Sequence, residues 1–178
     1  MSLDRLRRDP APARLLVCLD LRERAGLATA AHAGPRWRER ARILLHHARR
    51  AGWPIAHLLV GFPLAEASRW RAIHGLSPAP TEPVFYIDAD DGAPSRAFVR
   101  FANHFAAAEL LIMGKPSDRR QLERLVGALG ERELAAAADA MPAPPATPGV
   151  RLTAVSALIG LAPDLRVIPG GLREESKP

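Results

Sequence analysis

The stretch Leu15-Leu16-Val17-Cys18-Leu19-Asp20 decides the fold of this chain. Its five consecutive apolar residues have the length of a strand buried on both faces, which is typical of a parallel sheet covered by helices on both sides. Asp20 closes the run. A buried carboxylate there must be paired or hydrogen-bonded, and the same group can also serve as a general base. We therefore expect a central strand with an acid at its carboxyl end.

Similar apolar runs alternate with helical patterns along the rest of the chain. Helices are expected after Pro35, after the N-cap Ser95 and before Gly130, with short helices near Leu64–Trp70 and 155–160. Such alternation predicts an α/β fold, a Rossmann-like three-layer sandwich with a central, mostly parallel sheet of about six strands. The strands expected after the first are 55–60, 84–87, 110–113, 134–138 and 165–168.

Length and composition favour a single domain over residues 1–178, with flexible tails at 1–12 and 170–178. No apolar run approaches a membrane span. The only cysteine is Cys18, which excludes an internal disulfide and suits a reducing, cytoplasmic location. Since neither metal-ligand spacing nor a phosphate-binding glycine motif occurs, we expect no metal and no cofactor.

The formal charge of +6 comes from a basic set of 23 arginines and two lysines. Several arginines alternate along one predicted helix, at Arg36, Arg38, Arg40 and Arg42. Alternation by two spreads charges around a helix, and no aromatic residues interleave with the arginines on a strand. A solvated surface is therefore the preferred interpretation. This pattern does not favour binding of nucleic acid or another polyanion, which is kept as an alternative hypothesis.

Polar side chains gather where the predicted strands end, which is where open parallel sheets bind ligands. For Asp20 a structural and a functional role are equally open. His57 is interpreted as a satisfied core or interface histidine. Ser117 is interpreted first as a helix cap and only second as a nucleophile. The other groups at these ends are Asp88, Asp90, Asp91, Lys115, Asp118, Arg119, Arg120 and Asp139.

In this order the pieces resemble the isochorismatase-like hydrolases, which include nicotinamidases and carbamoyl hydrolases. The matching stretches are residues 15–20, 48–57, 82–85, 95–98, 110–114 with Ser117-Asp118, and 138–140. The resemblance implies a parallel six-stranded sheet between helices. It also implies an oligomer, formed either by this chain alone or with an active relative.

Family chemistry uses an Asp, a Lys and a Cys. By resemblance Asp20 takes the place of the Asp, whereas the Lys position falls on Ile87 or Gly92 and the Cys position on Arg120. Cys18 lies inside the first strand and is interpreted as a small buried hydrophobe. The resemblance therefore implies a catalytically degenerate member, expected to be a small-molecule-binding or oligomeric scaffold subunit and not an enzyme.

The alternative is a hydrolase with an altered site. It would combine Asp20 with Lys115, Ser117 or Arg120 and act on a small anionic or amide substrate; the same four residues are the expected ligand pocket. The family also carries a cis peptide bond just before the nucleophile helix. Lys115-Pro116 occupies that turn here, and a cis bond before proline is energetically cheap, so we predict one there.

Overall fold

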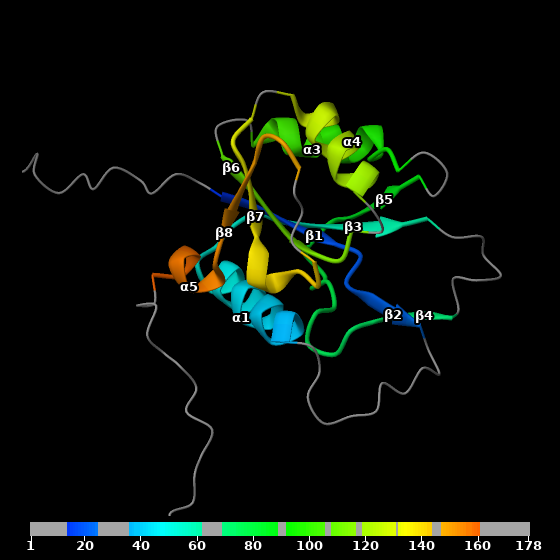
Figure 1. The fold of residues 1–178 in the computed structure, drawn as a ribbon. Helices are drawn as coiled ribbons and strands as arrows, with labels where there is room; N and C mark the ends of the chain where they lie inside the picture. The colour runs from blue at the N-terminus through cyan, green and yellow to red at the C-terminus, as the bar shows by residue number, and fades with distance from the viewer. Residues whose placement is uncertain are drawn as a thin grey trace, which may run out of the picture.

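The computed structural model describes residues 14–24, 36–61, 69–88, 92–105, 108–116, 119–130, 132–143 and 147–160. Its centre is a six-stranded sheet in which every neighbouring pair is parallel, with the order β5-β3-β1-β6-β7-β8 (Figure 1). The strands are β1 (Arg14–Leu19), β3 (Ile55–Val60), β5 (Val84–Ile87), β6 (Glu109–Gly114), β7 (Leu134–Ala137) and β8 (Val150–Thr153).

Helices cover both faces of this sheet, which confirms the three-layer α/β architecture (Figure 1). One face packs against α1 (Arg36–Arg50), the single turn Ala138–Ala140 after β7, and the short α5 (Val155–Leu158), which follows β8. The other face packs against α3 (Arg96–His104) and α4 (Arg119–Leu129). The strand β1 is buried along its whole apolar run because it lies in the middle of the sheet.

The helix boundaries follow from local chemistry. The buried stripe of α1 consists of Trp37 and four aliphatic residues at helical spacing, and the chain leaves the helix through Gly52 with φ +68°. Ser95 caps α3, since its Oγ accepts a hydrogen bond of 3.3 Å from the Phe98 N–H. Both features confirm the sequence-based expectation.

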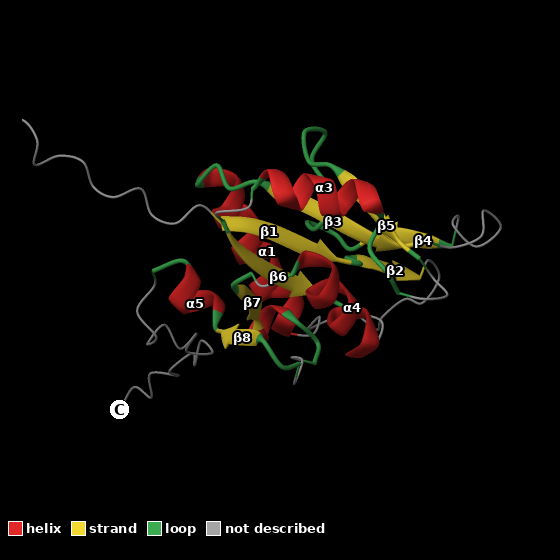
Figure 2. Ribbon diagram, turned by 90° about the horizontal axis from the view of Figure 1, so that it is seen from above, coloured by secondary structure: helices red, strands yellow, loops and turns green. Residues whose placement is uncertain are grey.

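The connectivity places a crevice at the carboxyl ends of β1 and β6. From β1 the chain runs outward through β3 to β5, and then returns to the other side of β1 with β6. Adjacent strands whose connections leave in opposite directions create the gap in which sheets of this kind bind ligands. A small antiparallel pair, β2 (Arg22–Arg24) with β4 (Trp70–Ala72), lies beyond the strand ends beside this crevice (Figure 2).

One strand was not expected, and two expectations need correction. The sixth strand of the described sheet is Val150–Thr153, and the expected strand 165–168 lies outside the described residues. The helix expected near Leu64–Trp70 does not extend to Trp70, because Trp70 is the first residue of β4. Residues 62–68 lie outside the described residues. The predicted cis bond between Lys115 and Pro116 is also wrong, since every peptide bond in the described ranges is trans.

None of the helices in the described part of the chain combines the length and the apolar character needed to cross a membrane.

Candidate functional site

The site at the strand ends is built around the close approach of β1 and β6. Gly114 ends β6 with φ +107°, and a Cβ atom at this position would lie 2.2 Å from the Leu19 carbonyl oxygen. The next residue, Lys115, donates its backbone N–H to the same oxygen at 2.8 Å. Only glycine allows this approach, which brings Lys115 to the carboxyl end of β1.

Asp20 follows β1 directly and is held from two sides. Its backbone N–H donates to the Leu58 carbonyl at 2.8 Å, and its φ of +37° is in the left-handed region. The carboxylate accepts a hydrogen bond of 2.6 Å from Arg22 Nε. The same guanidinium donates through Nη2 to the Val60 carbonyl at 2.7 Å. Arg22 therefore fixes the acid and ties it to the end of β3.

The electrostatics of Asp20 reflect burial opposed by cations. The residue is only 5% exposed, and burial raises the pKa of its carboxyl above the ordinary value. The hydrogen bond and charge of Arg22 act against this increase in pKa, and the charge of Lys115 does so further. The ion pair thus compensates a buried charge, and the carboxylate is already engaged by a permanent cation.

A cavity of about 290 Å³ opens beside this ion pair. Lys115 Nζ lies 5.5 Å from the centroid of the Trp70 ring and donates to the Arg22 carbonyl at 3.4 Å. Asp20 itself does not line the cavity. The lining consists of four cationic residues, one acid and three apolar residues, namely Arg22, Arg24, Arg38, Lys115, Glu23, Trp37, Trp70 and Ile73.

The structure brings together only part of the expected pocket. Asp20 and Lys115 lie close enough for their charges to interact, whereas Arg120 is exposed on α4 and does not line the cavity. Ser117 lies outside the described residues. Sequence analysis missed Arg22 and Trp70. The spacing Asp20-Leu21-Arg22, with a cation two residues after an acid at a strand end, was the one available signal for the first of them.

Cys18 is poorly placed to act as a nucleophile in this conformation. It is fully buried in the core between β3 and β6, as expected for a small hydrophobe. Burial raises the pKa of its thiol far above the usual range, and the negative charge of Glu82 adds to the increase while Arg49 opposes it. A thiol that stays protonated and inaccessible is a poor nucleophile.

We expect Cys18 not to react with thiol reagents in the folded protein. Dithionitrobenzoate should release less than about a tenth of an equivalent of thiolate in native buffer and one equivalent in urea, because reaction requires an exposed thiolate. Absorbance of the released thionitrobenzoate measures both values. Rapid stoichiometric reaction of the native protein would contradict the buried position.

A second cluster of interacting polar side chains is centred on Glu82. Its carboxylate accepts hydrogen bonds from Arg49 at 2.7 and 2.9 Å, from His57 Nε2 at 2.8 Å and from the Ala79 N–H at 2.8 Å. Burial acts to raise the pKa of Glu82, but these hydrogen bonds outweigh it and lower that pKa to about 2. Burial lowers the pKa of His57, and Glu82 opposes this decrease. His57 is therefore a satisfied core histidine, as predicted.

Asp139, another acid at the strand ends, also has a structural role. Asp139 Oδ1 accepts a hydrogen bond of 2.8 Å from the Val155 N–H and so fixes the start of α5. Within the described ranges, His, Cys, Asp and Glu side chains form no group of three or more that could hold a metal ion. Asp90, Asp91 and Asp118 lie outside these ranges.

Comparison with known proteins gives a likeness in structure only. No protein-family model matches the sequence, and no curated protein matches it. An isochorismatase from Pseudomonas putida is 14% identical, with a TM-score of 0.61 over 82% of this chain and 90% of that one. The N-carbamoylsarcosine amidase of Thermoplasma acidophilum is 15% identical, with a TM-score of 0.54 over 80% and 96% of the two chains. The MAR1 ribonuclease of Caenorhabditis elegans is 17% identical, with a TM-score of 0.60 over 83% and 80%.

These neighbours carry different activities on one architecture, so the likeness does not determine a reaction. The level of identity supports a statement about the fold, and the strand order and the two helical layers agree with it. This chain has the α/β fold of the isochorismatase-family hydrolases.

Proposed function

We propose that this chain is a catalytically degenerate protein of the isochorismatase fold that binds a small anionic molecule at its strand ends. The observation that carries the proposal is the position of Arg22. Its guanidinium is hydrogen-bonded to the carboxylate of Asp20, and the residue also lines the cavity. An acid that faces an arginine, not the cavity, is poorly placed to take a proton from a substrate. Of the two roles expected from sequence, ligand binding is the one that a cavity supports.

The lining favours an anion with a flat apolar body. Lys115 forms no ion pair with any described residue. Its ammonium faces the Trp70 ring. Arg38 is already paired with Glu23 at 3.0 Å, so Lys115 and the exposed Arg24 are the cations available to a ligand. The rings of Trp37 and Trp70 offer apolar surface beside these charges. A small aromatic carboxylate satisfies both features.

Benzoate and its neutral isostere benzamide test this ligand class. Benzoate in excess should raise the melting temperature of the protein by a few degrees and benzamide should not, since a ligand stabilises only the state that it binds. Lys115→Met should remove the benzoate shift. Arg100→Met, which removes an exposed cation from α3, should keep it. Equal shifts for both compounds, or an unchanged shift in Lys115→Met, would contradict the proposal.

The hydrolase alternative has one supporting feature, the closeness of Asp20 to the charge of Lys115. It requires turnover, which the binding proposal does not. Incubation of the purified chain with nicotinamide, isochorismate and N-carbamoyl compounds, followed by product analysis, separates the two. Turnover that is lost in Asp20→Ala would establish the hydrolase and refute the degenerate protein.

A further inference from the structure

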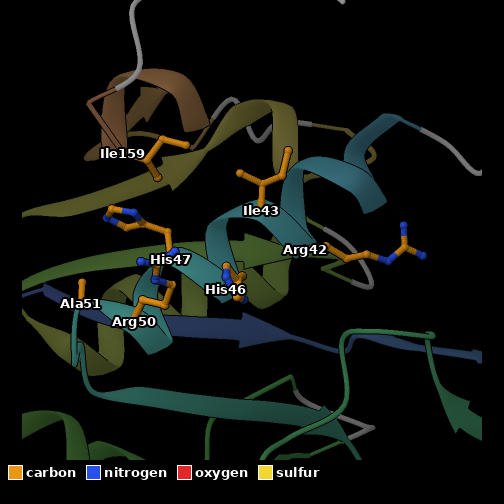
Figure 3. A pocket seen from close by; sticks show the side chains of 7 residues that line it. All are labelled: Arg42, Ile43, His46, His47, Arg50, Ala51 and Ile159. Carbon is orange, nitrogen blue, oxygen red and sulfur yellow. The ribbon is translucent and has the colours of Figure 1, made fainter.

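A groove of about 640 Å³ runs along the C-terminal half of α1, beside Ile159 (Figure 3). It shares no lining residue with the strand-end cavity, and its volume lies within the range of small-molecule pockets, roughly 300–1,000 Å³. We propose that this groove is a second binding site, for an amphiphilic monoanion: a carboxylate or sulfonate carried on an apolar body. The inference is independent of the function proposed for the strand ends.

One end of the groove is cationic and unpaired. Arg50 follows His46 by four residues and His47 by three, so the three side chains share one face of α1. No acidic residue lines the groove. Within the described residues, the ion pairs of α1 involve Arg38, Arg40, Arg42 and Arg49, which leaves Arg50 without one. A guanidinium flanked by two imidazoles is well suited to bind a small anion.

The rest of the groove is apolar. Ile43 precedes His47 by one helical turn, and Ile159 approaches from the end of α5 on the opposite side (Figure 3). The side chain of Arg42 extends away from this region. There its Nε donates to the His74 carbonyl at 2.9 Å and its Nη1 donates to Glu39. The charge is thus concentrated at the Arg50 end, with hydrocarbon surface next to it. That separation selects an anionic head with an apolar body over a bare anion.

The helix terminus does not oppose such an anion strongly. The last carbonyls of a helix carry partial negative charge, which disfavours a bound anion. Here the carbonyls of residues 47–49 already accept hydrogen bonds from the N–H groups of residues 51–53, at 2.8 to 3.3 Å. Three of the last four carbonyls of α1 are therefore already hydrogen-bonded, which leaves less unpaired negative charge at this end of the helix to repel an anion.

Fluorescence titration with anilinonaphthalene sulfonate, an anion with an aromatic body, tests the site. We expect saturable binding to the wild-type chain and an affinity about tenfold lower in Arg50→Gln, which loses a charged hydrogen bond. Ile159→Ser should weaken binding as well. Arg100→Gln on α3 should bind as tightly as the wild type, because Arg100 does not line the groove. The titrations are repeated in the Lys115→Met background, which removes a cation of the strand-end cavity, so that the remaining binding reports on the groove.

The uncharged analogue N-phenylnaphthylamine separates the charged from the apolar contribution. Its binding should be unchanged in Arg50→Gln and weaker in Ile159→Ser. Arg50 is exposed, so this variant should fold normally, and circular dichroism checks that it does. The proposal is overturned if the sulfonate shows no saturable binding in the Lys115→Met background, or if adding Arg50→Gln to that background leaves the affinity unchanged.

Discussion

Gly114→Ala is expected to destabilise the folded state by at least about 3 kcal/mol, or to prevent folding altogether. A methyl group at this position would lie 2.2 Å from the Leu19 oxygen, 2.9 Å from Leu21 Cδ2 and 3.0 Å from the Leu19 nitrogen. Two of these three atoms belong to the backbone of β1 and cannot move without breaking the pairing of the central strands. The φ of +107° adds strain, because side-chain-bearing residues rarely adopt it.

Gly127→Ala is the matched control for this prediction. Gly127 lies in α4, and its φ is not in the positive range that strains residues with side chains. A Cβ atom there would meet nothing within 4 Å. Alanine should therefore stabilise the helix by about 0.5–1 kcal/mol. Urea denaturation followed by circular dichroism measures both variants. A Gly114→Ala protein as stable as the wild type would show that β1 and β6 do not approach as closely as described.

Glu82→Gln is expected to cost about 3 kcal/mol at neutral pH. The substitution removes the charge that Arg49 and His57 share, and leaves an amide among donors that need an acceptor. The Glu82 side chain is only 7% exposed, so water cannot replace the lost partner well. The effect should appear as a lower urea midpoint with an unchanged m-value, since the folded state keeps its surface.

The pH dependence of this difference follows from the pKa of Glu82. Its ordinary value of 4.5 falls to about 2 on folding, so the contribution to stability is complete above 4.5 and is lost as the pH falls through about 2. The stability difference between wild type and Glu82→Gln should therefore shrink over this interval. Glu39→Gln is the control, because Glu39 pairs with Arg42 on the surface and should change stability by under about 0.5 kcal/mol at any pH. A constant difference for Glu82→Gln from neutral pH to pH 2 would contradict the pKa assignment.

Most of the fold was predictable because its central elements have strong patterns. The run at residues 15–19 is continuously apolar because β1 is covered on both faces, and the stripe of α1 repeats at helical spacing because one face packs on the sheet. The edge strand β8 was missed for the opposite reason. It has four residues, two of them exposed, so neither a continuous run nor a clear alternation marks it.

The candidate site was less predictable than the fold. The position of Asp20 at a strand end identified the acid, and the order of strands placed Lys115 near it. The partners that decide the chemistry come from elsewhere: Arg22 folds back from β2 onto the acid, and Trp70 arrives from β4, 50 residues later. Neither residue belongs to a pattern of consecutive positions, so no local rule could have selected it.

The pattern of residues along the chain was enough to predict the α/β class and the central strand with its terminal acid. These are properties of runs and spacings, which depend only on the periodicity of burial along the chain. The tertiary structure alone decided that Arg22 neutralises Asp20, that Cys18 is inaccessible, and that cationic grooves form at the strand ends and on α1. Such features depend on distances between residues far apart in sequence, and the packing of the layers fixes those distances.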